Sequence, residues 1–254
     1  MFIPIGDDNR DRKTTPVVTY LLIALNVYVF IYWQQLGTSL GFTYAFATVP
    51  GEILTGRDLI TETTVLIDPF TGQSFEMPGL QPTPYSVYLT LLTSMFMHGG
   101  VAHLLGNMMF LWIFGDNVED RMGHLPYLLF YLICGVLASL CHVLTTLILG
   151  QSLLIPSLGA SGAISGVLGA YIWLFPRRGV HVWVFLFIIT VPAFVAVGIW
   201  FLFQVTNGLG VLGGQEAGGV AYAAHIGGFI AGLLLVRRFA PKYPAREARK
   251  SGWM

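Results

Sequence analysis

The chain has 254 residues and a formal net charge of zero; 55% of its residues are hydrophobic and 10% are charged. A soluble domain carries roughly 25% charged residues, whereas no Asp, Glu, Lys or Arg lies between Met122 and Pro176. Because about 20 apolar residues are enough to cross a bilayer, this composition excludes a soluble globule, a disordered chain and a nucleic-acid-binding protein. It predicts a polytopic membrane protein.

Six apolar stretches predict transmembrane helices. The predicted spans are 17–36, 101–114, 125–149, 161–175, 182–205 and 221–236. We divide the chain into an N-terminal tail (1–16), a membrane domain (17–239) and a basic C-terminal tail (240–254). The connection 37–87 is too apolar for a linker and too broken for a span, so we interpret it as a structured loop lying partly in the membrane interface.

Positive charges set the orientation of the six spans. Twelve of the 13 Lys and Arg residues fall on one side of this arrangement, and only Arg57 falls on the other. Cytoplasmic loops carry an excess of Lys and Arg. The predicted fold is therefore an all-α bundle of six transmembrane helices with both termini in the cytoplasm.

Four polar side chains stand out inside the predicted spans: His103 and Asn107 in the second, Ser161 in the fourth and His225 in the sixth. Polar groups inside a membrane are costly and are functional-site candidates by default. Counted from the cytoplasmic ends of their helices at ~1.5 Å per residue, His103, Ser161 and His225 lie at heights of ~20, ~24 and ~18 Å in a core ~30 Å thick. Three helices therefore bring polar groups to nearly one level.

Small residues spaced four apart predict that the fourth and sixth spans touch. Such pairs let two helix backbones approach closely in lipid. The pairs are Gly162–Gly166 and Ser165–Gly169 in the fourth span and Gly228–Gly232 in the sixth. With these helices in contact, we expect Ser161 and His225 to come within hydrogen-bond reach, and neutral imidazole is the usual base that activates a serine.

The surroundings of Ser161 are suited to a developing negative charge. Ser161 opens a helix, where free N–H groups and the helix dipole favour an anion. His103 and Asn107 are four residues apart, so both can aim donors at one point, and one such donor is typically worth ~3–4 kcal/mol of the barrier. No aspartate inside the spans is placed to orient His225. The expected unit is a serine–histidine dyad without an acid.

Three motifs in this order resemble those of the rhomboid intramembrane serine proteases. They are HGGVAHLLGN at 98–107, GASGA at 159–163 and AHIGG at 224–228, with Gly232 following. The resemblance covers roughly residues 88–238 and includes the turn 119–121. Each motif alone is weak evidence for the resemblance, whereas three motifs in this order on the matching spans are specific evidence.

The resemblance implies six helices around a water-filled cavity that opens to the extracytoplasmic side. It implies cleavage of transmembrane substrates near their membrane boundary, with no cofactor and no metal. Six residues match functional positions of the family: the nucleophile Ser161, its base His225, the oxyanion-stabilising His103 and Asn107, and the cavity-lining His98 and Gly159.

Two features depart from the family pattern. The loop after the first span contains no tryptophan, so the Trp-Arg pair often found there is missing. Ser165 stands four residues after the nucleophile, where some members have an aromatic residue that contacts the histidine. How the loop is anchored and what holds His225 therefore stay open.

Alternative functions come from other classes. A client-binding relative without catalysis or a transporter would also be polytopic, although the internal repeat typical of transporters is absent. Zinc binding by His98, His103 and His225 is another alternative, but no carboxylate accompanies them in the spans. The His-Glu-x-x-His signature of a metalloprotease is absent.

The expected partners are transmembrane protein substrates and the lipid bilayer, and the oligomeric state stays open. The absence of an Arg- and Ser-rich presequence favours a prokaryotic cell membrane. The Gly-rich segment 207–219 lacks the features of a phosphate-binding loop and is expected to be a mobile cap over the cavity.

Overall fold

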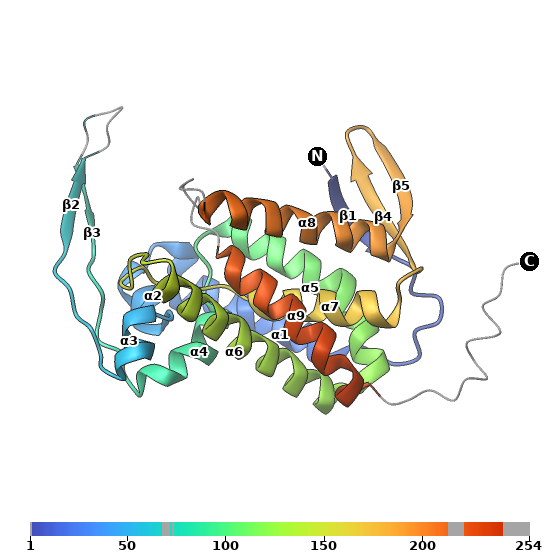
Figure 1. The fold of residues 1–254 in the computed structure, drawn as a ribbon, viewed down its shortest axis with the longest axis horizontal. Helices are drawn as coiled ribbons and strands as arrows, with labels where there is room; N and C mark the ends of the chain where they lie inside the picture. The colour runs from blue at the N-terminus through green and yellow to red at the C-terminus, as the bar shows by residue number, and fades with distance from the viewer. Residues whose placement is uncertain (1, 68–71, 73, 213–220, 241–254) are drawn as a thin grey trace, which may run out of the picture.

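The structure, a computed structural model, describes residues 2–67, 72, 74–212 and 221–240. It is mostly helical and carries two small antiparallel sheets (Figure 1). The helices are α1 (Val17–Tyr28), continued as a π-helix (Val29–Trp33), α2 (Leu40–Phe46), α3 (Pro50–Thr55), α4 (Thr90–Thr93), α5 (Val101–Met122), α6 (His124–Ile148), α7 (Ser161–Leu174), α8 (Ala193–Leu212) and α9 (Tyr222–Phe239). The strands are β1 (Phe2–Asp7), β2 (Thr64–Ile67), β3 (Ser74–Met77), β4 (Gly179–Val184) and β5 (Phe187–Pro192), in sheets ordered β1-β4-β5 and β2-β3.

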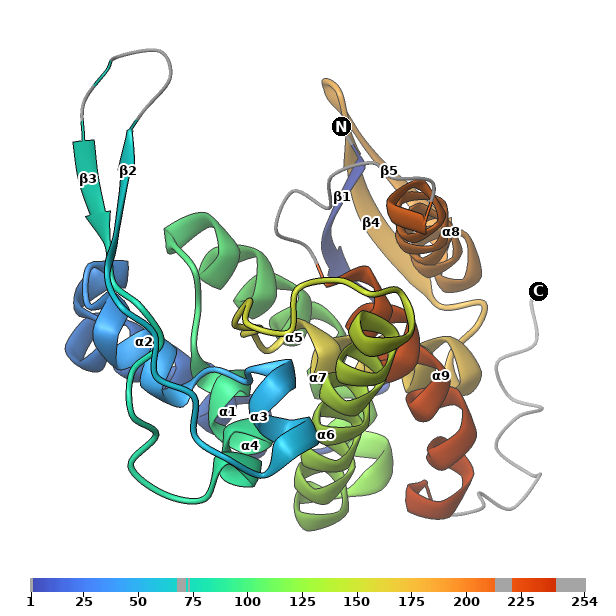
Figure 2. The same cartoon turned by 60° about the vertical axis from the view of Figure 1, so that its left-hand side comes forward.

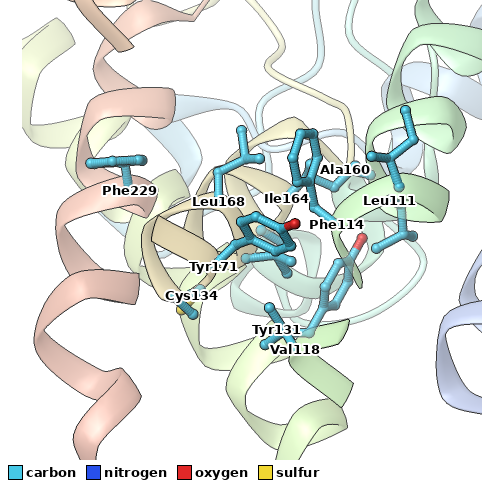
Figure 3. Packing of buried hydrophobic residues seen from close by; sticks show 14 of the residues in the cluster. Leu111, Phe114, Val118, Tyr131, Cys134, Ala160, Ile164, Leu168, Tyr171 and Phe229 are labelled. Carbon is cyan, nitrogen blue, oxygen red and sulfur yellow. The ribbon is translucent and has the colours of Figure 1, made fainter. Parts of the chain in front are cut away.

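Helix α7 lies in the middle of the bundle, in contact with α5, α6 and α9 (Figure 2). Every residue from Gly162 to Tyr171 is buried, as expected of a helix that is apolar on all sides. Side chains of the neighbouring helices close around it, among them Phe114, Tyr131 and Phe229 (Figure 3). Ser161, the first residue of α7, is therefore carried by an enclosed helix.

Length and hydropathy identify fewer membrane spans than the six predicted. Among the described helices, His124–Ile148 and Ala193–Gly210 are each long and apolar enough to cross a bilayer. The segment Val87–Phe96 and helix α5 count as a third span only if the two are taken together, since they are bent by 81°. Val17–Trp33 and Ser161–Leu174 are shorter apolar helices.

The fifth predicted span, 182–205, is wrong over its first half. Residues up to Pro192 form the strands β4 and β5, and α8 begins only at Ala193. The run is rich in Val, Ile and Phe, which favour strands, and its Pro192 fits the position just before a helix. Strand β1 pairs with β4, so part of the predicted N-terminal tail joins this sheet. The fold is therefore not purely α-helical.

Other boundaries also differ from the prediction. Helix α5 runs to Met122, so residues 119–121, expected in a turn, lie in the helix, which ends at Gly123 with φ +85°. The Gly-rich segment 207–219 belongs to α8 as far as Leu212, and the rest of it lies outside the described residues. The predicted C-terminal tail lies outside them too, apart from Ala240.

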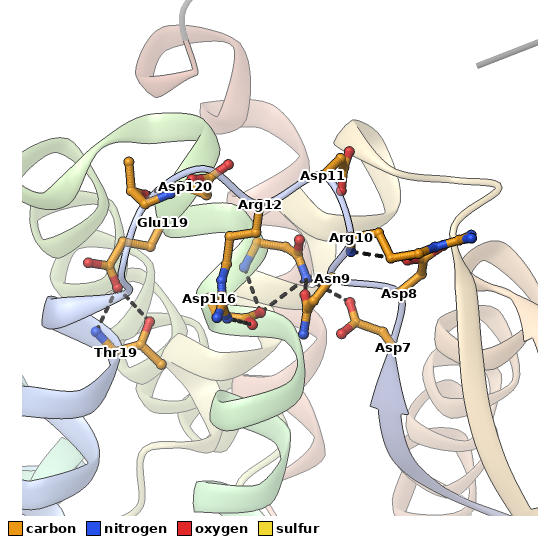
Figure 4. Close-up of polar contacts among 12 residues, drawn as sticks. Asp7, Asp8, Asn9, Arg10, Asp11, Arg12, Thr19, Asp116, Glu119 and Asp120 are labelled. Carbon is orange, nitrogen blue, oxygen red and sulfur yellow. Dashed lines mark hydrogen bonds and ion pairs between the residues drawn. The ribbon is translucent and has the colours of Figure 1, made fainter. Parts of the chain in front are cut away.

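Polar contacts tie the N-terminal segment to the end of α5 (Figure 4). The Glu119 carboxylate accepts hydrogen bonds from the backbone N–H groups of Val18 (2.8 Å) and Thr19 (2.7 Å). These are donors that the first turn of a helix cannot satisfy itself, and the residue before α1 supplies no side-chain cap. Arg12 pairs with Asp116 at 2.5 Å. Helix α1 is thus held to α5 at the charged end of the bundle.

Asp7, the last residue of β1, lies in the same polar region (Figure 4). Its Oδ2 accepts hydrogen bonds from the Tyr171 hydroxyl and from Asn117 Nδ2 (2.8 Å). Burial raises the pKa of the Asp7 carboxyl to about 7, against the lowering effect of the Tyr171 hydrogen bond. Asp116 raises this pKa further and Arg178 lowers it.

We expect the folded protein to lose stability relative to an Asp7→Asn variant as the pH rises from about 4 to about 7. The folded state binds the Asp7 proton more tightly than the unfolded chain, so this stabilisation is complete at low pH and is lost through the raised pKa. A shift of about three units sets an upper bound of about 4 kcal/mol. Thermal unfolding of both proteins at about pH 5 and about pH 8 measures the effect. An unchanged difference in Tm between the two conditions would contradict it.

Candidate active site

Ser161 and His225 meet at one end of two contacting helices. Ser161 is the first residue of α7, and His225 lies in the first turn of α9. Ser161 Oγ and His225 Nε2 are 2.7 Å apart, which is the separation of a good hydrogen bond. The structure thus brings together the two side chains that the sequence predicts as a dyad.

Glycines allow α7 and α9 to approach this closely. A Cβ atom on Gly228 would lie 2.1 Å from the Gly162 carbonyl oxygen, and one on Gly232 would lie 2.0 Å from the Gly166 carbonyl oxygen. Both distances are far inside van der Waals contact, so the two backbones touch directly, as small-residue helix pairs do in lipid. The four predicted packing glycines therefore lie at the contact that sets the distance between Ser161 and His225.

The second ring nitrogen of His225 is held by α8. Gln204 Oε1 lies 2.8 Å from His225 Nδ1, and Gln204 Nε2 faces the Trp200 carbonyl oxygen one turn earlier at 3.5 Å. An amide oxygen only accepts hydrogen bonds, so Nδ1 carries the proton and Nε2 presents its lone pair to Ser161. The Trp200 ring also faces the imidazole, with centroids 6.2 Å apart. These contacts answer, from α8, the open question of what holds His225.

The sequence reasoning missed Gln204, although it carries a signal. Gln204 is an amide in a run without Asp, Glu, Lys or Arg from 179 to 215, and only 5% of it is exposed. A buried amide needs a hydrogen-bond partner, and a polar side chain inside an apolar span is the same signal that singles out Asn107 and His225. The many phenylalanines of this segment draw attention to lipid contact instead.

His103 lies across Gly159 from the nucleophile. A Cβ atom on Gly159 would stand 3.0 Å from His103 Nε2 and 3.6 Å from Ser161 Oγ. Gly159 also has φ +124°, which residues with a side chain rarely adopt. The Gly99 N–H donates to His103 Nδ1 (3.3 Å), so Nε2 carries the hydrogen of the neutral ring. That N–H lies on the side of Gly159 and Ser161.

Asn107 offers a donor one helical turn after His103. It is 7% exposed, and its Nδ2 has no hydrogen-bond partner among the described residues. A buried N–H without a partner costs about 1–3 kcal/mol. An unpaired amide at Asn107 therefore indicates a function that outweighs this cost. The first N–H groups of α7, that of Ser161 included, lack partners within their own helix. Helices α5 and α7 are in contact, so the Asn107 donor and the N–H groups at the start of α7 lie on neighbouring helices.

His98 is fully buried beside His103, with ring centroids 5.2 Å apart. The buried side chain of Gln34 fixes its backbone on both sides. Gln34 Nε2 donates to the His98 carbonyl oxygen (2.9 Å), and the His98 N–H donates to Gln34 Oε1 (2.8 Å). A single glutamine after the first helical segment therefore holds the start of the HGG motif.

The connection 37–87 braces the backbone just before the nucleophile. It contains α2, α3 and the β2–β3 hairpin. Thr48 and Ser157 exchange backbone hydrogen bonds of 2.9 and 2.8 Å, and the Gly159 N–H donates to the Ser94 carbonyl oxygen (2.9 Å). Thr48 Oγ1 also lies 2.9 Å from Ser94 Oγ. The bonds made by Thr48 anchor the loop without a Trp-Arg pair.

The three histidines considered as zinc ligands do not form a metal site, although both ring nitrogens of His98 are buried without a hydrogen-bond partner among the described residues. Both ring nitrogens of His225 face protein oxygens, and His98 is buried edge-on to His103. In the part of the chain that the structure describes, no group of three His, Cys, Asp or Glu side chains is placed to hold a metal ion. The zinc alternative therefore has no site among these residues.

Comparisons with known proteins match the same region. A family model described as the Rhomboid domain matches residues 86–242. Rhomboid protein 1, mitochondrial, of Saccharomyces cerevisiae is 33% identical over 147 residues, covering 58% of this chain and 40% of that protein. RHOMBOID-like protein 4 of Arabidopsis thaliana is 38% identical over 146 residues (57% and 32%). Rhomboid protease GluP of Bacillus subtilis is 32% identical over 149 residues (56% and 24%). The matched region covers less than half the length of each relative.

Proposed function

Because the chain belongs to the rhomboid family, we propose that it is an intramembrane serine endopeptidase, which hydrolyses a peptide bond in or near the transmembrane segment of a membrane-protein substrate. The 2.7 Å contact between Ser161 Oγ and His225 Nε2 carries the proposal. Among the relatives, one is named a protease and another only rhomboid-like. A client-binding protein without catalysis is the alternative, and the hydrogen-bonded Ser161, His225 and Gln204 favour the protease.

In the proposed mechanism His225 is the general base. Its Nε2 takes the Ser161 proton while Oγ attacks the substrate carbonyl carbon, giving a tetrahedral intermediate. The same proton then passes to the leaving amine, and the C–N bond breaks. Water attacks the resulting ester with His225 again as base, which releases the carboxylic acid and restores Ser161. Gln204 keeps the imidazole in the required tautomer throughout, by accepting the Nδ1–H.

The oxyanion of this intermediate needs donors on the side of Ser161 that faces His103. His103 Nε2–H, Asn107 Nδ2–H and the Ser161 N–H are the proposed donors. Their availability supports this: His103 Nδ1 is already an acceptor, and Asn107 Nδ2 has no partner among the described residues. Pre-placed donors act without reorganisation cost at the moment of reaction.

A six-span topology with cytoplasmic termini belongs to the same proposal. Gly228 touches Gly162 and Gly232 touches Gly166, so α7 and α9 run parallel, as a fourth and a sixth span must. Arg178, after α7, pairs with Asp11 in the N-terminal segment, close to the polar end of α5. Positive charges from separate connections thus gather at one end of the helices, which agrees with the positive-inside rule.

The family places the chain in a membrane but does not choose which one. The relatives include proteins named mitochondrial and one from Bacillus subtilis. The expectation of a prokaryotic cell membrane therefore gains no support from them.

A substrate helix must unwind before Ser161 can reach a carbonyl carbon, because a helical amide is hydrogen-bonded and shielded. Two Leu→Gly changes near the extracytoplasmic boundary of a reporter helix cost about 2 kcal/mol of helix stability. We expect them to raise the initial cleavage rate by up to roughly 30-fold. Proteoliposomes with the purified protein, gel analysis and mass spectrometry of the products measure rate and cleavage site. Equal rates for both reporters would count against unwinding, and no cleavage of either would favour the client-binding alternative.

Gln204→Met should lower kcat by about 10-fold with little change in KM, since it keeps the side-chain length but removes one hydrogen bond of about 1.5 kcal/mol. Gln204→Glu keeps an acceptor and should retain more activity. Asn207→Ala is the matched control, because this amide lies on the same helix and its Nδ2 donates to the Phe203 carbonyl oxygen (2.7 Å). Steady-state cleavage rates of the glycine-containing reporter, measured for each variant, test the positioning role of Gln204. An unchanged kcat in Gln204→Met would rule out the positioning role.

A further inference from the structure

The hairpin formed by β4 and β5 exposes apolar side chains. Figures 1 and 2 show it projecting beyond the helices, crosswise to α8. At its turn, Phe185 is 75% exposed and Leu186 is 90% exposed. The exposed large apolar side chains along the hairpin are Trp183, Phe185, Leu186, Phe187, Ile188 and Ile189.

These side chains point to both faces of the sheet. Trp183 and Ile188 are cross-strand partners, so they share one face. Phe187 and Ile189 alternate with Ile188 along β5 and lie on the other face. A protein partner would cover one face, whereas an apolar medium covers both faces and the turn. Exposed apolar patches of this kind mark interaction sites, and the distribution favours lipid.

The hairpin continues a surface that is already suited to lipid. On α8, Phe194, Leu202 and Phe203 are each more than half exposed, and no Asp, Glu, Lys or Arg lies between 179 and 215. At the base of the hairpin, two residues before β4, Arg177 is exposed. An arginine beside an apolar segment attracts anionic lipid headgroups.

The open edge of the sheet limits how deep the hairpin can lie. Because the strand order is β1-β4-β5, β5 is paired on one side only. Its outer N–H and C=O groups need water or headgroups, which the hydrocarbon core does not supply. The boundary between headgroups and acyl chains offers apolar surroundings for the side chains and hydrogen-bond partners for the outer edge of β5. Aromatic residues are enriched at this boundary.

We propose that the β4–β5 hairpin is an interfacial membrane anchor. Its turn inserts Phe185 and Leu186 among the acyl chains just below the headgroups, with Arg177 at the level of the lipid phosphates. This anchor goes beyond the proposed proteolysis and does not depend on it.

A fluorophore at the turn tests the proposal. Leu186→Cys, in a Cys134→Ala and Cys141→Ala background, is labelled with an environment-sensitive dye and reconstituted in vesicles of neutral and anionic phospholipid. Glu76→Cys on β3, in the exposed second hairpin, is the matched control. Quenching by a nitroxide near the top of the acyl chain is compared with quenching by aqueous iodide.

We expect the Leu186→Cys label to be quenched strongly by the lipid nitroxide and several-fold less by iodide than the Glu76→Cys label. Equal iodide quenching at both sites, without nitroxide quenching, would overturn the proposal. Energy transfer between labelled copies that disappears on dilution with lipid, again without nitroxide quenching, would also overturn it and assign the hairpin to a second copy. Neither outcome depends on peptidase activity.

Discussion

Ser161→Ala and His225→Ala are each expected to reduce cleavage of a transmembrane reporter to background. Loss of the nucleophile or the base of a serine protease costs roughly 10⁶-fold in kcat, so both variants should read as inactive in any ordinary assay. Both side chains lie at the start of their helices and outside the buried apolar core, so Tm should change little. Initial rates in proteoliposomes and thermal unfolding in detergent measure the two effects.

A fluorophosphonate probe reacts with a serine whose hydroxyl is activated by a base and not with an ordinary serine. We expect the adduct on Ser161, located by mass spectrometry, and no adduct in His225→Ala. Ser165→Ala is the matched control: Ser165 lies one turn further along α7, is fully buried, and its Oγ donates to the Ser161 carbonyl oxygen (2.6 Å), so its loss should leave labelling in place. Full cleavage activity in either dyad variant, or an adduct elsewhere, would disprove the dyad.

The contact between Ser161 and His225 could be anticipated because its determinants are local in the sequence. The glycine pairs of α7 and α9 show their four-residue spacing directly, and such spacing requires only regular helices to produce one small-residue face. The depth of each polar group follows from counting residues along a helix. Both arguments need no knowledge of loops.

Gln204 could not be placed by the same counting, because the start of its helix was wrong. With a span beginning at residue 182, Gln204 falls at the far end of the helix, away from the level of the dyad. With α8 beginning at Ala193, Gln204 lies about 16 Å along it, near the level counted for His225. An error in one boundary thus hid a residue of the site.

The start of the fifth span was predicted wrongly because strand β4 depends on a partner far away in the sequence. Strand β4 is stabilised by pairing with β1, where Phe2 faces Val184 and Asp7 faces Val180. Hydropathy along 182–192 cannot reveal a partner about 180 residues away in sequence, and a continuous apolar run fits a buried strand or a helix equally. The β1 register became visible only in the structure.

Gly232→Ala should destabilise the protein by about 3 kcal/mol or more, although alanine is the better helix former by about 1 kcal/mol. The added Cβ would stand 2.0 Å from the Gly166 carbonyl oxygen and 2.8 Å from the Gly166 Cα atom. Backbone atoms cannot move aside as a flexible side chain can, so α9 must shift away from α7. That shift lengthens the hydrogen bond between Ser161 and His225, and kcat should fall together with Tm.

Gly198→Ala on α8 is the matched control, because there the same substitution is expected to keep or raise the stability instead of lowering it. A Cβ atom on Gly198 meets nothing within 4 Å, so only the helix propensity acts, and the change should be neutral or stabilising by up to about 1 kcal/mol. Thermal unfolding and the initial cleavage rate are measured for both variants in the same detergent. Opposite changes in Tm are the expected result, since the two substitutions add the same methyl group to the same kind of backbone. Equal changes would mean that α7 and α9 do not touch backbone to backbone, and the close approach that brings His225 to Ser161 would need another cause.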